Sequence, residues 1–280
     1  MTLAIAWKSM DGAILGTDTE FTGGGGYSKY KGKKILGFPE LRSQPFFAFA
    51  GVVDYSMMCI DKMVKVIKKE EKKAAPDVPA VIEREIVRIH KEYGALYPDK
   101  LLTLQLLIVL RHPGAKLALF KVRGPIMAPI PDDGVECIGV GELAFRLIVD
   151  RFYRDRMTTP QVDRAVMYTL FKAKEFVGGV GKDSEIVFFR DGEPKFGCLP
   201  VEAGSIALFQ ETLSTFDEAA KDILLSYNTV EEDAGLFEHR LKVFSQTLIE
   251  ARTKQIEHLK RLNVRVGFGV SRSLDQDGEG

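Results

Sequence analysis

The N-terminal stretch decides the fold, and residues 1–22 of it are MTLAIAWKSMDGAILGTDTEFT. Residues 3–7 and 13–17 are short apolar segments on either side of Asp11-Gly12. Asp-Gly is a strong hairpin signal because both turn residues tolerate positive φ. Residues 34–37 and 46–50 are two further short apolar segments, and the stretch closes at Ala50-Gly51. These 51 residues therefore predict a set of short strands joined by tight connections.

The remaining elements extend this start into a layered pattern. Two helices are expected at about 54–72, with Asp54 as N-cap, and from Pro79 to Gly94. Strands are expected at 101–110, 117–122 and 135–138, then helices at 142–153 and 160–177 with Thr159 as cap, then a hairpin of 185–189 and 195–199. This order of strands, helix pair, strands, helix pair and strands is typical of an α+β protein. A sandwich of two sheets with a helix pair on each outer face, a four-layer αββα sandwich, uses every element.

The C-terminal part has a different character. We expect a first domain over residues 1–205, a mostly helical extension over 206–270 and a disordered tail over 271–280. Within the extension, Ser214-x-x-Asp217 is similar to a capping box that opens a helix to about 227. A longer helix is expected at 234–262, followed by a short strand at 264–268. The extension is expected to mediate assembly or to narrow access to a site; packing on its own subunit is an equal alternative.

Composition excludes several functional classes. The 280 residues carry 39 Lys+Arg and 39 Asp+Glu, so there is no basic excess that would indicate nucleic-acid or anionic-membrane binding. Cys59, Cys137 and Cys198 are odd in number and form no CxxC pair, which argues against a disulfide framework or a zinc site. Neither a signal peptide nor a membrane-spanning segment is evident. We expect a soluble cytoplasmic protein that needs no metal or cofactor.

Thr2 is the first residue with a chemical interpretation. Because threonine is small, an ordinary aminopeptidase can remove Met1 and leave an α-amine on the same residue as a hydroxyl. An α-amine titrates at about pH 7.7–8.0, which suits a general base near neutrality. That amine can take the proton of the weakly nucleophilic threonine hydroxyl, directly or through water. Taken alone, Thr2 is far better explained as just the second residue of any protein, so the surrounding residues decide.

The wider stretch resembles proteasome-type β subunits and the bacterial ring protease that works with an ATP-dependent unfoldase. Counted from Thr2, the residues Asp18, Thr22, Lys34 and Ala50-Gly51 all fall at that family's distances. The resemblance covers roughly residues 2–200 and includes the order of elements. It implies the N-terminal nucleophile (Ntn) hydrolase fold and a threonine-type peptidase.

The resemblance also implies a role for each matched residue. Lys34 would sit as a cation beside the Thr2 hydroxyl and lower its pKa, while Asp18 would hold Lys34 in place. The backbone N–H of Gly51 would stabilise the oxyanion, and the backbone of Thr22 would bind an extended substrate as an added strand.

The first specificity pocket is carried over from the resemblance in the same way. Phe21, Gly32, Phe49 and Val53 fall near the positions that shape this pocket in the family. All four are uncharged, so an apolar side chain is expected before the cleaved bond. Phe49 is expected to make the pocket shallow.

Three positions depart from the family pattern. Val140, Gly179 and Lys182 stand where the family usually has Ser, Asp and Ser. Those groups normally form hydrogen bonds to the free amine of the nucleophile. Asp183-Ser184 could replace two of them in a shifted register.

The resulting prediction is a threonine hydrolase that cleaves peptide or amide bonds through an acyl-enzyme. The expected assembly is a homo-oligomer, either a ring or a partial ring, with an ATP-dependent unfoldase as a candidate partner. One alternative is a structural or binding subunit that has lost turnover. Another is a small-molecule amidohydrolase or acyl-transfer enzyme on the same fold. A closed ring with an inner chamber favours proteolysis, whereas a monomer or dimer favours small substrates.

Overall fold

The computed structural model describes residues 2–23, 28–94, 104–111, 116–191, 198–227 and 234–266. The chain divides into two compact units, Met1–Ala203 and Gly204–Gly280. Some expectations lie wholly or partly outside the described residues. They are the fate of Met1, residues 101–103 and 195–197 of two expected strands, residues 267–268 of the strand expected at 264–268, and the disordered tail at 271–280.

Two five-stranded antiparallel sheets form the centre of the first unit. In spatial order, the first sheet contains β10 (Val135–Gly139), β1 (Leu3–Ser9), β2 (Gly12–Asp18), β11 (Ser184–Arg190) and β12 (Cys198–Pro200). The second contains β5 (Ile35–Gly37), β6 (Phe46–Ala50), β7 (Gln105–Leu110), β8 (Ala118–Arg123) and β9 (Ile126–Ile130). A separate hairpin joins β3 (Glu20–Gly23) to β4 (Ser28–Lys31). The predicted Asp11-Gly12 turn connects β1 and β2, as the pairing of Ser9 with Gly12 shows.

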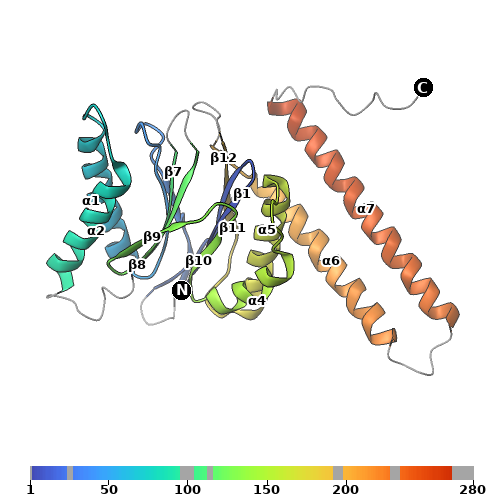
Figure 1. Ribbon diagram of the computed structural model, residues 1–280. Coiled ribbons are helices and arrows are strands. Elements are labelled where there is room, and N and C mark those ends of the chain that lie inside the picture. Colours follow the sequence, from blue (N-terminus) through green and yellow to red (C-terminus); the bar gives the residue numbers. More distant parts are fainter. Residues whose placement is uncertain are drawn as a thin grey trace, which may run out of the picture. The chain divides into compact units, whose positions relative to one another are not determined.

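Helix pairs cover the outer faces of the two sheets (Figure 1). On one side, α1 (Val53–Glu70) and α2 (Val78–Gly94) bury Ile60 and Ile86 against the second sheet. On the other side lie α4 (Glu142–Phe152) and α5 (Thr159–Phe176). A side chain on Gly16 of β2 would meet Val166 of α5 at 2.6 Å, so this glycine lets the helix approach the first sheet closely. The predicted four-layer αββα sandwich is confirmed.

The space between the sheets is filled by alanines, aliphatic side chains and the edge-to-face pair of Phe46 and Phe189. Ala4, Ala6 and Ala13 of the first sheet pack with Ala48 and Leu107 of the second. The strands β1 and β2 are buried at every position because helices cover one face and the second sheet covers the other. This explains why their sequences are continuous apolar runs rather than alternating patterns.

Several predicted boundaries were wrong for local reasons. The N-cap of α1 is Val52, and Asp54 lies in the first turn, where its charge favours the helix dipole. The cap of α5 is Thr158, whose capping box with Gln161 displaces the predicted Thr159 by one position. No strand is expected at residues 126–130, because Pro129 disfavours a strand interior. These residues nevertheless form β9, since β9 is an edge strand, where a missing N–H is tolerated.

The second unit contains two long helices, α6 (Ala203–Tyr227) and α7 (Ala234–Val266). Its helices contact one another through Phe216 and Phe244, whose rings are 5.4 Å apart, and through a 2.9 Å hydrogen bond between Ser205 Oγ and His258 Nε2. The predicted capping box at Ser214 is wrong because α6 starts eleven residues earlier. Hydroxyls inside α6 bond back to the helix, as Thr212 does to the Leu208 carbonyl, so polar residues do not end it.

The predicted short strand at 264–268 is also wrong where it can be compared, because residues 264–266 continue α7. Residues 267 and 268 lie outside the described part. A pair of alternating valines is too short a signal to overcome an established helix. Among the described residues, no helix is long and apolar enough to cross a membrane.

Candidate active site

Thr2 lies immediately before β1 and is nearly fully buried, with 5% of its surface exposed. The next amide, Leu3 N–H, donates a 2.9 Å hydrogen bond to Asp18 Oδ1. Asp18 is the last residue of β2 and is held there by its pairing with Ser184 of β11, next to the Ala4–Thr17 pair that joins β2 to β1. Its second oxygen accepts from the backbone N–H groups of Glu20 at 3.1 Å and Gly181 at 3.3 Å. The Asp18 carboxylate therefore binds backbone N–H groups of three separate segments, one of which is the residue next to Thr2.

Lys34 completes this arrangement from the loop before β5. Its Nζ donates to both oxygens of Asp18 at 3.0 Å and to the Glu20 carbonyl. Both side chains of the Lys34–Asp18 pair are fully buried. Asp18 Oδ1 accepts hydrogen bonds from both Leu3 N–H and Lys34 Nζ. The ammonium group is therefore linked through this one oxygen to the backbone next to Thr2.

Burial changes the proton affinity of Lys34. Removal of its ammonium from water lowers the pKa of Lys34 below its usual range, and the attraction of Asp18 offsets only part of this effect. The Phe21 ring, whose centroid is 5.0 Å from Nζ, also shields the ammonium from solvent. Lys34 can therefore exchange a proton at lower pH than a surface lysine.

Gly139 brings the Ala50-Gly51 turn next to Thr2. A side chain built on Gly139 would lie 1.9 Å from the Thr2 carbonyl oxygen and 3.5 Å from Ala50 Cβ. Only glycine fits this close approach, and its φ of +101° also favours glycine. Gly139 is held by a 2.8 Å hydrogen bond from its N–H to Gln105 Oε1. Gly51, the predicted oxyanion donor, is exposed and has a φ of +108°.

The predicted pocket residues belong to one aromatic cluster. The rings of Phe21 and Phe49 are 6.1 Å apart, and a side chain on Gly32 would meet the Phe21 ring at 2.5 Å. Val53, the first residue of α1, packs against the larger hydrophobic core that includes Phe21 and Phe49. Phe21 is 8% and Phe49 is 2% exposed, so the rings fill most of the space that they line.

The strand that carries Thr22 has an unpaired edge. In the described residues, β3 pairs only with β4, with Thr22 opposite Lys29. The Thr22 hydroxyl is buried without a hydrogen-bond partner. Among the described residues, no strand pairs with the edge of β3 away from β4.

No protein-family model matches the sequence, and no curated protein is detectably similar to it. Solved structures of Anbu proteins, described as ancestral β-subunits, are similar in structure. The one from Yersinia bercovieri has a TM-score of 0.65 and 11% identity, and the match covers 82% of this chain and 100% of that chain. One from Hyphomicrobium sp. strain MC1 (0.63, 15%) and one from Pseudomonas aeruginosa (0.63, 14%) each match over 83% of this chain and 99% of theirs. The fold is that of the Ntn hydrolases. At these identities the likeness extends to the fold alone.

Val140, Gly179 and Lys182, the three departures from the pattern of proteasome-type β subunits, supply neither a hydroxyl nor a carboxylate. Val140 is 47% exposed beside the β10–α4 connection. Gly179 and Lys182 have φ values of +87° and +57° in the loop that leads to β11. That loop is held by its backbone, because Gly181 N–H contacts Asp18.

The suggested replacements, Asp183 and Ser184, already have other partners. The Asp183 carboxylate pairs with Lys31, and its backbone exchanges hydrogen bonds with Thr19. The Ser184 hydroxyl accepts a 2.8 Å hydrogen bond from Lys174 Nζ.

Two charged residues near the site had no sequence signal. Lys174, in the last turn of α5, reaches Ser184, which is the direct cross-strand neighbour of Asp18. Burial lowers the pKa of Lys174, and the negative charges of Asp18 and Asp183 partly oppose this. Glu185 accepts from the Lys34 N–H at 3.3 Å, and burial raises its pKa. Their spacing from Thr2 follows no motif. The pairing of β11 with β2 brings Glu185 close, and the packing of α5 on the first sheet brings Lys174 close.

Proposed function

We propose that this chain is an N-terminal threonine hydrolase that cleaves peptide or amide bonds through an acyl-enzyme. The observation that carries the proposal is the fully buried Lys34–Asp18 pair, which shares an Asp18 oxygen with the amide next to Thr2. A buried ion pair is a weak source of stability because desolvation opposes the attraction. Its position beside a small hydroxyl residue at the N-terminus favours a chemical role.

In the proposed reaction, removal of Met1 frees the Thr2 amine. The amine, directly or through a water molecule, takes the hydroxyl proton while Oγ attacks the amide carbon, and the Lys34 ammonium stabilises the developing negative charge on Oγ. Gly51 N–H donates to the tetrahedral oxyanion. The C–N bond breaks as the proton passes to the leaving amine, which leaves an ester on Thr2. Water, deprotonated by the same amine, hydrolyses the ester and restores the hydroxyl.

The proposed substrate is an extended polypeptide or amide. It would add as a strand to the open edge of β3, with the Thr22 backbone as its partner. An apolar side chain before the cleaved bond would contact Phe21 and Phe49, which with Gly32 and Val53 offer no charge. Because these rings are already well packed, the contact surface would be shallow and would favour small or medium apolar groups.

We further propose that the chain works in a self-assembled oligomer, as a ring or partial ring in the cytoplasm. The similar solved structure from Pseudomonas aeruginosa is a helical assembly of the Anbu complex. The α6–α7 unit supports assembly because α7 exposes Leu241, Val243 and Ile249. If the assembly encloses a chamber, an ATP-dependent unfoldase is the partner that would supply polypeptide.

A binding or structural subunit is the second candidate, and the residues at 140, 179 and 182 favour it. The groups that usually support the free amine are replaced there by an apolar side chain, a glycine and a lysine. An amine without such support would position its proton less well, and turnover would be slow or lost.

Intact mass spectrometry with and without a threonine-directed epoxyketone tests the proposal. We expect loss of Met1 and one adduct per chain, an adduct retained in Thr2→Ser and absent in Thr2→Ala. Loss of Met1 without an adduct would favour the binding subunit. Retained Met1 would overturn the mechanism, because the proposed base would be blocked as an amide. Size measurement of the same sample tests the oligomer.

A further inference from the structure

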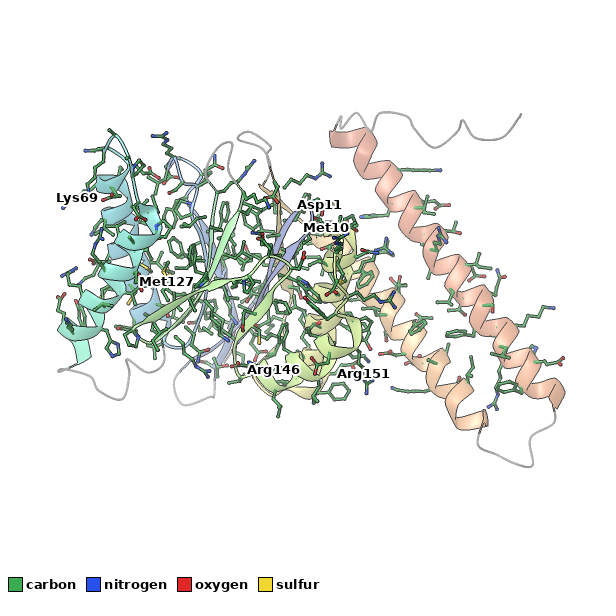
Figure 2. All side chains as sticks on the ribbon, viewed as in Figure 1. Met10, Asp11, Lys69, Met127, Arg146 and Arg151 are labelled. Atoms are coloured by element: carbon green, nitrogen blue, oxygen red, sulfur yellow. The ribbon has the colours of Figure 1, made fainter. Side chains whose placement is uncertain are left out.

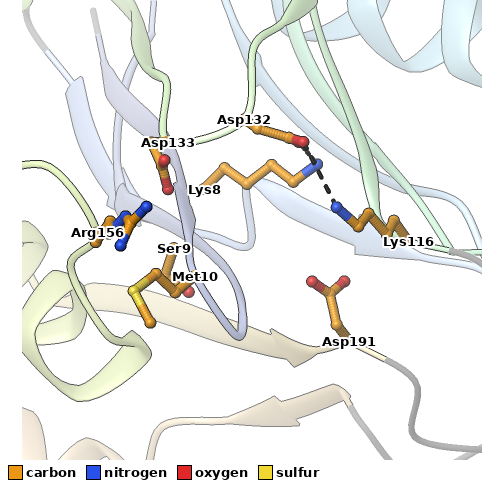
Figure 3. Close-up of a pocket in the computed structure, with 8 residues that line it drawn as sticks. All are labelled: Lys8, Ser9, Met10, Lys116, Asp132, Asp133, Arg156 and Asp191. Atoms are coloured by element: carbon orange, nitrogen blue, oxygen red, sulfur yellow. Dashed lines mark hydrogen bonds and ion pairs between the residues drawn. The ribbon is translucent and has the colours of Figure 1, made fainter.

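A cavity of about 310 Å³ lies at the end of β1 that is remote from Thr2 (Figure 3). Its lining comes from Lys8, Ser9, Met10, Lys116, Asp132, Asp133, Arg156 and Asp191. Thr2 precedes β1, whereas Lys8 and Ser9 end it, and Figure 2 places Met10 at the outer tip of the sheet. Seven residues of extended chain span about 20 Å, so this end cavity is separate from the candidate active site.

The walls of the end cavity are fixed by hydrogen bonds between distant segments. Lys8 Nζ is buried and donates to the Leu117 carbonyl at 2.8 Å and to Asp132. The Leu117 N–H donates to Asp191 Oδ1 at 3.1 Å, and the Tyr153 hydroxyl donates to the Asp133 carbonyl at 3.1 Å. These bonds fix Lys8, Asp191 and the backbone of Asp133, whereas Lys116 and Arg156 reach the cavity from its exposed rim.

The charges that line the cavity are balanced but incompletely paired. Three side chains are basic and three are acidic. Lys8 is paired with Asp132, and Lys116 approaches the same carboxylate at 3.8 Å. Arg156 and the Asp133 carboxylate make no ion pair with any residue that the structure describes, although both lie on the same side of the cavity in Figure 3. Across the cavity, Lys116 faces Asp191 in the same view.

Backbone conformation adds a second observation at the same place. Asp133 and Arg156 have φ values of +62° and +59°, a region that side-chain-bearing residues rarely adopt. Two such residues on separate loops line one cavity, and conformations of this kind concentrate at ligand-binding sites.

This pattern selects the ligand by charge. A phosphate or other pure anion would meet three carboxylates, and a pure cation would meet two ammonium groups and a guanidinium. A zwitterion satisfies both signs, with its carboxylate on the forked Arg156 guanidinium and its ammonium on Asp133. Met10 is 55% exposed and provides a flexible apolar wall for a side chain.

We infer that the end cavity binds a small zwitterion, of the size of an α-amino acid or a dipeptide. Arg156 and Asp133 recognise its carboxylate and ammonium, and Lys116 with Asp191 define the opposite wall. This inference does not depend on the proposed hydrolase activity.

Ligand-observed saturation-transfer NMR on the full chain, with the twenty amino acids and glycyl-L-leucine, tests binding. Calorimetry on the strongest ligand then compares it with its N-acetylated and its amidated forms, each of which lacks one charge. We expect each blocked form to bind at least about tenfold more weakly, the effect of losing one charge-assisted hydrogen bond. Tighter binding of the amino acid or of the dipeptide shows which of the two classes of zwitterion the cavity fits.

Variants locate the site. Arg156→Gln and Asp133→Asn should weaken binding about tenfold or more, whereas Arg154→Gln, in the same connection but outside the cavity, should not. A thermal melt of each variant verifies folding, and Asn at 133 tolerates the same backbone conformation as Asp. Absence of saturation transfer to every probe, equal affinity of the blocked forms, or unchanged affinity in Arg156→Gln would each overturn the inference.

Discussion

The two ends of β1 each hold a buried lysine paired with an aspartate, but the two pairs differ in solvent exposure. At the Thr2 end, Lys34 and Asp18 are both fully buried. At the far end, the side chain of Lys8 is 8% exposed, whereas that of Asp132 is 66% exposed. Burial lowers the pKa of Lys34, whereas the hydrogen bond and charge of Lys8 lower the pKa of Asp132. The same pair of residue types therefore gives a lysine that loses its proton more easily at the Thr2 end and an aspartate that stays ionised at the far end.

Replacing each lysine by methionine should separate the two ends most clearly. Lys34→Met leaves the buried Asp18 carboxylate without its cation and should destabilise the fold by about 3–5 kcal/mol. It should also abolish epoxyketone labelling and peptide hydrolysis. Lys8→Met leaves an exposed carboxylate in water and should cost about 1–2 kcal/mol, mainly from the lost bond to the Leu117 carbonyl. Urea unfolding and peptidase assays measure both effects.

Equal losses of activity in the two variants would contradict the comparison. Lys34→Arg provides a folding control, because it keeps the charge next to Asp18. If that variant is stable and inactive, the loss belongs to the chemistry and not to folding.

The second prediction concerns the backbone next to Thr2. Gly139→Ala places a methyl group 1.9 Å from the Thr2 carbonyl oxygen and demands a φ that alanine disfavours. We expect a destabilisation of about 3 kcal/mol and a large loss of labelling at Thr2. Gly178→Ala is the matched control, since a side chain there meets nothing within 4 Å. Labelling that survives in Gly139→Ala would show that Thr2 tolerates displacement.

Much of this fold follows from the sequence because each layer has its own local signal. The Asp11-Gly12 turn, the apolar strands and the proline and glycine helix ends fix the order of elements. That order has few compact solutions. Element ends were less predictable: Val52 caps α1 without a side-chain hydrogen bond, and nothing in the sequence distinguishes it from Asp54.

The site was predictable only where it comes from one continuous segment. Thr2, Asp18 and Lys34 lie within 33 residues of each other, so their spacing alone identifies them as a set. Lys174 reaches Ser184 only because α5 packs on the first sheet, and the distance along the chain carries no trace of this contact. The end cavity has the same origin, since packing brings Arg156 and Lys8 to line one cavity although they are far apart in the sequence.

The third prediction concerns the pH dependence at the Thr2 end. Activity should rise with pH as the Thr2 amine loses its proton, at about pH 7.7–8.0. It should fall again as Lys34 loses its proton, at a pH below that of an ordinary lysine, because burial lowers this pKa. Asp18 raises the pKa of Lys34, so Asp18→Asn should move the falling limb to lower pH. A limb that does not move in kcat/KM profiles would exclude Lys34 as the group responsible.

Replacement of Lys174 is expected to have the smallest effect on activity, and the direction in which it moves the falling limb of the pH profile is informative. Lys174 is a second cation near Asp18, and the Asp18 charge opposes the lowering of its pKa by burial. Removing a positive charge from this neighbourhood favours protonation of Lys34, so Lys174→Met should move the falling limb to higher pH, opposite to Asp18→Asn. We expect kcat to fall by less than about tenfold, because the Ser184 contact is lost while the Asp18–Lys34 pair remains.

Lys172→Met on the same helix, where the lysine pairs with Glu175, is the matched control and should leave the falling limb of the pH profile in place. A purely structural Lys174 would lower stability without moving the limb, and that result would show that Lys34 and Asp18 act without it.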